Sequence, residues 1–352
     1  MTDAKVLDIP RMEFKVGESG FSPIAALVTS MKAFGEKITY RYMMGISGAA
    51  FRLYWMKGFD VSSAAVSSEN PAVIGARALG YSYYEYSGLS ENETWSHVTQ
   101  SIDEGKPVPA CGIVPPMEWQ VICGYTAGKA KKLLVESYYD LDPTKPTEVP
   151  FKRWQGWGSR GPATMPFAVF KKKGPAPSHH VVAFESLARA VLLAHEFEYW
   201  IGPHTDAGET AHEHVWHSGL AAFDSWADDM KAEFKAREAP QKLYANDLSA
   251  YTLQDARICA ASFMDALSGE FPSSRSHFDI AKAAYHQEAE VIAEARKLVP
   301  YPWDAHPNVK QSDVSGFADL GVRAQWVEAL RKAKELDAKA TDALGAAIAA
   351  LR

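Results

Sequence analysis

The chain is poor in cysteine, with three among 352 residues: Cys111, Cys123 and Cys259. Thiols so few and so widely spaced cannot build a disulfide framework or a four-thiolate zinc site. The N-terminus lacks a basic segment followed by an apolar run, so we expect no signal peptide. No apolar stretch approaches the roughly 18 residues that cross a bilayer. These absences predict a cytoplasmic protein without a membrane partner.

The sequence also lacks an excess of basic residues. The chain has 37 Lys and Arg against 43 Asp and Glu, which gives a net charge of -6, and its basic residues are scattered. Nucleic acid is therefore not an expected partner. What is present is ordinary for a globular protein: 47% apolar and 23% charged residues, in a chain long enough to bury a large core.

Hydrophobic periodicity divides the chain into two expected domains. Residues 1–175 combine helical patterns with runs of period two, which predicts an α+β fold with a mainly antiparallel sheet. Its expected strands lie at 81–86, 108–114, 119–125, 133–139 and 165–171. Residues 176–352 predict a helical domain packed against the first. Its expected helices span 181–200, 211–237, 248–267, 278–298 and 319–351.

A helix predicted from Ser22 to Phe34 organises the first domain. Ser22 is a favourable N-cap residue, Pro23 suits the first helical position, and Gly35 suits the end. A helix N-terminus also stabilises an anion, and enzymes place nucleophiles there. Ser22 is thus either a helix cap, which its residue type favours, or a nucleophile.

A glycine-flanked turn at Gly45–Gly48 leads to Arg52. It lacks the third glycine of a dinucleotide fingerprint, and Ala49 stands where a nucleophile elbow needs glycine. For Gly48 we weigh a packing turn against a loop that binds phosphate or an oxyanion. For Arg52 we weigh a plain salt bridge against binding of a substrate carboxylate or phosphate.

A carboxylate opens an otherwise apolar strand at Glu118. A buried carboxylate is costly unless it is paired, so we expect a functional or binding role for Glu118. The neighbouring Trp119 and other aromatic residues indicate the wall of an apolar pocket for a small molecule.

Four histidines crowd into one short segment: His204, His212, His214 and His217. On a helix His214 and His217 would share a face. The segment misses the zincin motif, because Trp216 stands where the second histidine is required. Three interpretations stay open: a divalent-metal site, a polar patch in which His214 and His217 contact a substrate, or an exposed helix start.

Several motifs together carry a family resemblance. Ser22 lies thirteen residues before Gly35, Ile102-Asp-Glu-Gly-Lys-Pro-Val108 joins a helix to a strand, and Glu118-Trp-Gln-Val-Ile-Cys-Gly-Tyr125 forms a later strand. These motifs resemble the papain-like fold of bacteriocin-leader peptidases and of the butirosin-biosynthesis-H-like family. Gly219-Leu-Ala-Ala-Phe-Asp-Ser-Trp226 is similar to a helix typical of butirosin-H-like proteins.

The resemblance implies a changed active site. Ser22 takes the place of the family's cysteine, or Phe21 does if the proline is aligned instead. Glu118 takes the place of the histidine, and the third triad residue falls near Ser137. The thiolate–imidazolium pair is therefore absent, although the family's chemistry is acyl or amide transfer.

We therefore expect a papain-like protein that binds or processes a small molecule, by acyl or amide transfer or by hydrolysis in a biosynthetic pathway, without a cysteine nucleophile or a cofactor. One alternative is a non-catalytic ligand-binding module. Another is a metal-dependent enzyme built on the four histidines. A homodimer is compatible with the sequence.

Overall fold

The computed structural model describes residues 4–116, 118–140, 142, 144–155, 165–204 and 212–351, with the backbone alone for 155, 201–204 and 212–214. The chain forms two units. The first consists of Met1–Met43 and Pro71–Ser178, and the second of Met44–Asn70 and His179–Arg352. The sequence grouped residues 44–70 with the first domain, whereas in the structure they belong to the second unit.

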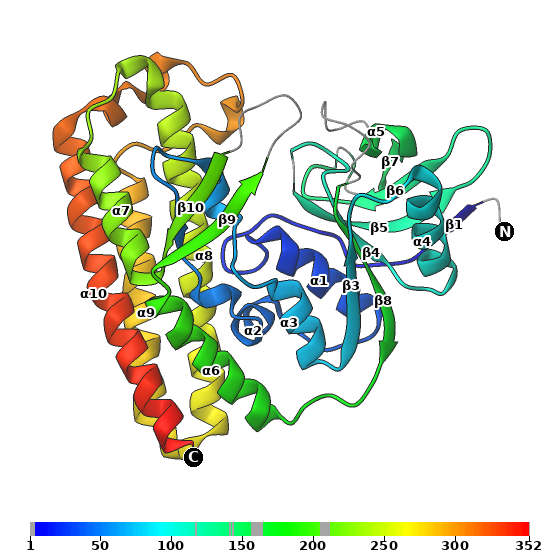
Figure 1. Cartoon of the computed structure of the whole chain (residues 1–352), viewed down its shortest axis with the longest axis horizontal. Helices are drawn as coiled ribbons and strands as arrows, with labels where there is room; N and C mark the ends of the chain where they lie inside the picture. The colour runs from blue at the N-terminus through cyan, green and yellow to red at the C-terminus, as the bar shows by residue number, and fades with distance from the viewer. Residues whose placement is uncertain are drawn as a thin grey trace. The chain divides into compact units, whose positions relative to one another are not determined.

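An antiparallel sheet forms the centre of the first unit (Figure 1). In spatial order its strands are β3 (Tyr81–Tyr86), β8 (Phe167–Lys173), β4 (Val108–Cys111), β5 (Trp119–Thr126), β6 (Lys132–Glu136) and β7 (Thr147–Pro150). A further strand, β1 (Ala4–Val6), pairs with β5. The sequence predicted most of these strands, but β1 and β7 lie outside the predicted runs.

Helices accompany this sheet: α1 (Ser22–Ala33), α3 (Pro71–Ala78), α4 (Glu91–Asp103) and α5 (Phe151–Gln155). A capping box begins α4, since the Ser90 hydroxyl accepts from the Glu93 amide at 3.3 Å and the Glu93 carboxylate accepts from the Ser90 amide at 3.0 Å. Val98 and Ile102 of α4 are buried in the core that includes Ile122 of β5. The helix α2 (Tyr40–Ile46) spans the point where the chain passes between the units.

The second unit is mainly helical, as the sequence predicted for its C-terminal half. Its helices are α6 (His179–His195), α7 (Gly219–Lys231), α8 (Ala239–Glu270), α9 (Arg275–Arg296) and α10 (Leu320–Ala350), with 3-10 turns at Ala49–Phe51, Val61–Ala64, Ala236–Glu238, Pro272–Ser274, Trp303–Ala305 and Gln311–Ala318. The long helices α8, α9 and α10 lie side by side (Figure 1). Trp226 stacks on Trp55 with ring centroids 4.6 Å apart and on Trp326 at 6.3 Å, so one aromatic column joins the strand β2 (Tyr54–Trp55), α7 and α10.

A small sheet corrects the helix predicted over 211–237. Its strands are β2 (Tyr54–Trp55), β10 (His212–Ser218) and β9 (Glu198–His204), in that order. The helix α7 begins only at Gly219, whose φ of 57° breaks the strand. A Cβ at this position would meet the Ala194 carbonyl oxygen at 2.3 Å, which explains the glycine. Pairing of β10 with β9 and β2 therefore prevails over the local helical pattern.

A buried cluster of charged side chains ties three helices of the second unit together. The fully buried Arg257 of α8 contacts Glu288 of α9 at 2.9 Å and Asp337 of α10 at 2.8 Å. Its remaining nitrogen donates to the Ala50 carbonyl at 2.9 Å. Two carboxyl groups thus share one guanidinium, and burial raises the pKa of Glu288 and of Asp337.

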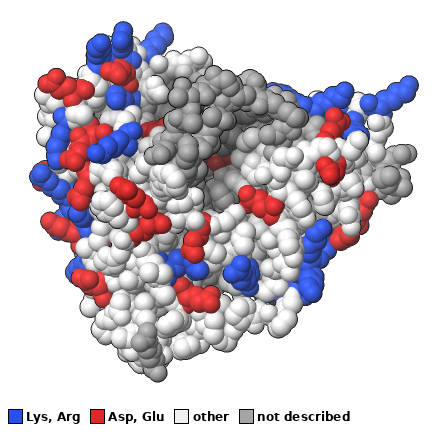
Figure 2. Space-filling view, in the orientation of Figure 1, with Lys and Arg blue, Asp and Glu red and all other residues white. Residues whose placement is uncertain are grey.

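The surface has a mixed charge. On the face shown in Figure 2, basic and acidic side chains are interspersed over the described residues, as the net composition leads one to expect. Among the described helices, none combines the length and the apolar run that a membrane crossing requires.

Candidate functional site

Ser22 lies at the start of α1, but it does not cap the helix. The N-cap residue is Phe21, and no side chain caps the first turn. The Phe21 carbonyl accepts from the amides of Ile24 and Ala25 at 3.1 and 3.0 Å. The cap that the sequence favoured for Ser22 is therefore wrong: the helix begins one residue earlier, and the serine hydroxyl is available for another partner.

Two tyrosines hold the backbone that leads into α1. The Phe21 amide donates to the Tyr40 hydroxyl at 2.7 Å. The Tyr138 hydroxyl donates to the carbonyl of Ser19, three residues before Ser22. These contacts anchor the backbone on the N-terminal side of Ser22 independently of the serine side chain.

The side chain of Ser22 pairs with Glu118. Its hydroxyl donates to the Glu118 carboxyl, and its oxygen accepts from the Trp119 amide at 3.1 Å. The pairing of β6 with β5 begins at Val121 of β5. The Trp119 amide lies before this point and is therefore available to Ser22. At 3% exposure Ser22 is almost completely removed from water. The serine oxygen therefore lies between an acceptor for its proton and a donor to its lone pair.

The surroundings of Glu118 make it a better base than an exposed carboxylate. Burial raises its pKa, and the hydrogen bond from Ser22 opposes this in part. Its Oε1 atom accepts from no group among the described residues. Cys111 on the neighbouring strand stays neutral, because burial first and the Glu118 charge second raise its thiol pKa to about 12.

Two further features at the start of α1 favour a negative charge: the helix dipole and the backbone amide of Ser22. Ser22 is the first helical residue, where the helix dipole favours an anion. In the described part of the chain its own amide has no acceptor. A negatively charged oxygen formed near Ser22 would therefore accept a hydrogen bond from the Ser22 amide, at the positive end of the helix dipole.

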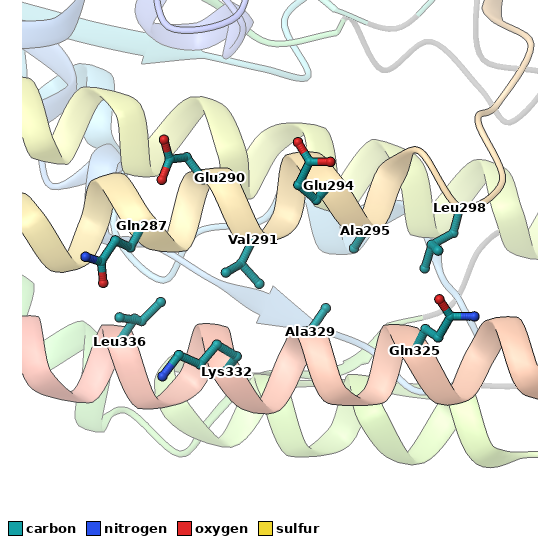
Figure 3. Close-up of a pocket in the computed structure, with 10 residues that line it drawn as sticks. All are labelled: Gln287, Glu290, Val291, Glu294, Ala295, Leu298, Gln325, Ala329, Lys332 and Leu336. Carbon is teal, nitrogen blue, oxygen red and sulfur yellow. The ribbon is translucent and has the colours of Figure 1, made fainter.

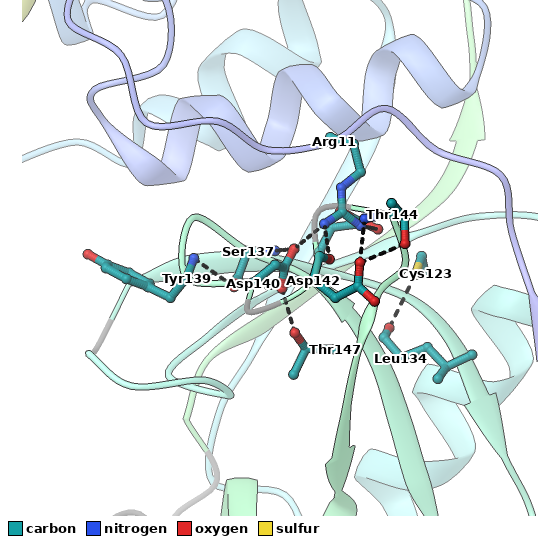
Figure 4. A network of polar contacts seen from close by, with 10 residues as sticks. Arg11, Cys123, Leu134, Ser137, Tyr139, Asp140, Asp142, Thr144 and Thr147 are labelled. Carbon is teal, nitrogen blue, oxygen red and sulfur yellow. Dashed lines mark hydrogen bonds and ion pairs between the residues drawn. The ribbon is translucent and has the colours of Figure 1, made fainter.

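A polar network surrounds Ser137, the position that the family resemblance assigned to the third triad residue. The Ser137 hydroxyl donates to Asp140 at 3.1 Å (Figure 4). Arg11 contacts Asp140 at 3.0 Å and Glu136 at 2.6 Å. The serine hydroxyl also accepts from the Tyr139 amide at 3.1 Å, so the hydrogen bonds of Ser137 serve this turn rather than Glu118.

Glu136 is the least satisfied member of that network. It is 2% exposed, and its Oε2 atom has no partner among the described residues. Burial raises its pKa to about 7, with Arg11 opposing the shift and Asp140 adding to it.

The structure places Gly48 and Arg52 in the second unit. Gly48 has a φ of 83° and precedes the 3-10 turn at Ala49, and a Cβ there would lie 2.4 Å from the Arg189 side chain. Arg52 is buried and donates to the carbonyls of Ala64 at 2.8 Å and Val66 at 3.3 Å. The Arg52 guanidinium holds a backbone loop, and Gly48 occupies a backbone conformation that requires glycine.

The histidine segment forms a strand, not a helix, so the helical face predicted for His214 and His217 does not exist. The His217 ring nitrogen lies 3.9 Å from Glu198, and its ring packs edge-on against Phe197 at 6.0 Å. The side chains of His204, His212 and His214 lie outside the described residues. Among the described side chains, no three His, Cys, Asp or Glu residues converge to hold a metal ion.

A groove of about 520 Å³ lies between α9 and α10. Figure 3 shows Val291 of α9 and Ala329 of α10 pointing toward one another across it. Glu290, Glu294 and Lys332 line its edges. No cluster of reactive side chains accompanies this groove, so the Ser22–Glu118 pair is the stronger candidate site.

Sequence reasoning missed Glu136 and Gln120. A signal for Glu136 was present, because a single carboxylate ends the apolar run of Leu133 to Val135, as Glu118 opens another. Gln120 gave no such signal, since a neutral amide in a strand is unremarkable until its partners are known.

Comparison with known proteins adds no relative: no family model matches the chain, and no curated protein does.

Proposed function

We propose that this chain is a papain-like protein, similar to the butirosin-H-like family, that transfers or hydrolyses the acyl group of a small molecule in a biosynthetic pathway. Ser22 is the nucleophile in place of cysteine, and Glu118 is the general base in place of histidine. The observation that carries the proposal is the hydrogen bond from the Ser22 hydroxyl to the Glu118 carboxyl.

The arrangement of the first unit supports this assignment. α1 packs against β5 of an antiparallel sheet, and the start of the helix meets the start of the strand at Ser22 and Trp119. A nucleophile at a helix N-terminus with its base on a neighbouring strand is the arrangement that the family resemblance implies.

The proposed reaction follows from the two hydrogen bonds at Ser22. As its oxygen attacks the carbonyl carbon of an ester or amide, its proton passes to Glu118. The Trp119 amide and the helix dipole stabilise the serine oxygen, while the Ser22 amide donates to the negative carbonyl oxygen. Glu118 then protonates the leaving group, and an acyl-serine forms.

Release of the acyl group reverses these steps. Water or an acceptor amine or alcohol attacks the acyl carbon and gives its proton to Glu118. The bond to the Ser22 oxygen breaks, and Glu118 returns the proton to that oxygen. Hydrolysis and transfer therefore share one residue pair and differ only in the incoming nucleophile.

Burial partly compensates for the weak basicity of a carboxylate. An ordinary Glu has a pKa of about 4.3 and takes a hydroxyl proton poorly. The raised pKa of Glu118 makes its ionised form a stronger base.

Labelling with a fluorophosphonate, which reacts with activated serines, tests the proposal. We expect the wild-type protein to be labelled at Ser22, as located by peptide mass spectrometry, and Ser22→Ala to lose the label. Ser30→Ala is the matched control, because Ser30 lies on the same helix and bonds the Ala26 carbonyl at 2.9 Å.

Equal labelling of Ser22→Ala and wild type would refute Ser22 as the nucleophile. A wild-type protein that takes no label would favour the non-catalytic ligand-binding module instead.

A further inference from the structure

The β4–β5 connection, residues 112–118, carries Glu118 to Ser22. Its two ends are joined where the Gly112 amide donates to the Glu118 carbonyl at 3.0 Å. Near the end of the loop the Glu118 amide donates to the Pro116 carbonyl at 2.9 Å. The middle of the loop needs another anchor, because it lies beyond the ladder that ends at Cys111 and Trp119.

Gln120 supplies that anchor. Its Oε1 accepts from the Val114 amide at 2.9 Å, and its Nε2 donates to the Val114 carbonyl at 2.5 Å. One side-chain amide thus satisfies both backbone groups of one residue, as a neighbouring strand would. Gln120 is 1% exposed, so water does not compete for these bonds.

The position of Gln120 connects this anchor to the candidate site. It follows Glu118 by two residues at the start of β5, and residues two apart in a strand share a face. Val114 precedes Glu118 in the loop. Gln120 therefore holds the loop from the strand side while the Gly112–Glu118 bond closes it.

We propose that Gln120 is a positioning residue that fixes the loop at Val114 and so holds the Glu118 carboxyl against the Ser22 hydroxyl. This role rests on the proposed function, in which Glu118 exchanges a proton with Ser22. A glutamine suits it because the amide offers one acceptor and one donor in the same plane, which matches the acceptor and donor of a peptide unit.

The substitution Gln120→Met removes both bonds and keeps the side-chain length. It leaves the amide and carbonyl of Val114 without partners, so the loop must move to reach water. We expect fluorophosphonate labelling of Ser22 to slow about 10- to 100-fold, since a small displacement of a reacting group has an effect of this size. Ser101→Ala is the control, because it removes a buried bond to the Lys106 carbonyl elsewhere in the first unit.

The substitution Gln120→Glu separates positioning from stability. A neutral carboxylic acid can still accept from the Val114 amide and donate to its carbonyl, whereas the ionised form cannot donate and repels Glu118. We expect the labelling rate relative to wild type to fall as the pH rises through the pKa of the new carboxyl, which burial at this position raises above the ordinary value of about 4.3. A ratio that does not change with pH would overturn the proposal, provided that circular dichroism shows a folded variant throughout.

A second measurement does not need a reactive serine. The ¹³C resonance of the Glu118 carboxyl, assigned with Glu118→Gln, reports its pKa in wild type and in Gln120→Met. We expect the Gln120→Met value to shift toward the ordinary pKa of about 4.3, because a released loop exposes the carboxyl to water. Identical values would overturn the positioning role. If wild type takes no label, the proposed function fails, and this titration still decides the role of Gln120.

Discussion

The Ser22 hydroxyl donates its hydrogen bond to the carboxyl of Glu118, a residue 96 positions away in the chain. Neither residue has a second side-chain partner among those described. The first residue of α1 and the residue just before β5 thus contribute one side chain each to this contact. Both belong to the first unit, whose fold brings them together.

Labelling of Ser22 is expected to depend on the ionisation of Glu118. Only the ionised carboxylate can take the serine proton, so the rate should rise with pH as Glu118 loses its own proton. Because burial raises the Glu118 pKa, the half-maximal rate should lie above the ordinary value of about 4.3. Labelling rates measured across the pH range check this profile.

Glu118→Gln removes the base and leaves the shape almost unchanged. We expect labelling to slow about 100-fold or more and to lose the pH dependence due to Glu118. Glu104→Gln, on a half-exposed residue paired with Lys106 at 2.8 Å, serves as the control. A pH profile shared by wild type and Glu118→Gln would show that another group is the base.

The stability of the first unit is expected to vary with pH through Glu136. Burial raises its folded-state pKa to about 7, so the folded state holds this proton more tightly than the unfolded state does. The stabilising contribution is present below the unfolded pKa of about 4.3 and is lost as the pH rises through the folded value. Urea unfolding at several pH values should show wild type losing stability relative to Glu136→Gln over this range.

Glu148→Gln provides the matched comparison for Glu136. Glu148 lies on β7, is largely exposed and pairs with Lys132 at 2.8 Å. Its substitution should not reproduce the change in pH dependence. If Glu136→Gln and wild type keep a constant difference in unfolding free energy from pH 4 to 8, the pKa of Glu136 is not raised.

The Arg257 cluster predicts unequal effects of substitution. Arg257→Met leaves two buried carboxyl groups without their cation and should destabilise the protein by about 3–5 kcal/mol in urea unfolding. Glu288→Gln should cost much less at neutral pH. The amide oxygen of glutamine can still accept from Arg257, and Asp337 remains as the partner of the guanidinium. Burial raises the Glu288 pKa, which lowers the cost of replacing its carboxyl by a neutral group.

Glu290→Gln is the control for this comparison, because Glu290 lies two residues further along α9 with 64% of its side chain exposed. A loss in Glu288→Gln as large as that in Arg257→Met would contradict this ranking of the two substitutions.

Metal removal separates the serine mechanism from the histidine alternative. In the proposed mechanism Ser22 and Glu118 supply both nucleophile and base, so dialysis against a chelator should leave labelling at Ser22 unchanged. A stoichiometric loss of metal together with a loss of activity would instead point to the histidine-rich segment. Metal analysis before and after dialysis, with His217→Ala as a comparison, checks this prediction.

Local patterns made much of the fold predictable. The apolar spacing and the bounding proline and glycine located α1, and aromatic or apolar runs located β3, β5 and most of β8. These signals reside within a few consecutive residues, where a helix or strand period is read directly. The pairing of Ser22 with Glu118 was also within reach, because a carboxylate beginning an apolar strand needs a partner.

Other features depended on distant parts of the chain. The segment 212–218 became a strand because β9 and β2 pair with it, which its own composition did not reveal. Ser22 does not cap α1 because its hydroxyl pairs with Glu118, 96 residues away. Arg257 joins side chains from two other helices, and no spacing within α8 predicts that contact.

The backbone before α1 is held by Tyr40 and Tyr138 and not by the side chain of Ser22. The residues that hold the backbone here, Tyr40 and Tyr138, therefore differ from the residue proposed as the nucleophile, Ser22. A substitution at residue 22 would remove its contacts with Glu118 and Trp119 and leave the two tyrosine contacts in place. The chemistry at residue 22 can therefore be changed by mutation without touching the groups that anchor the backbone before it.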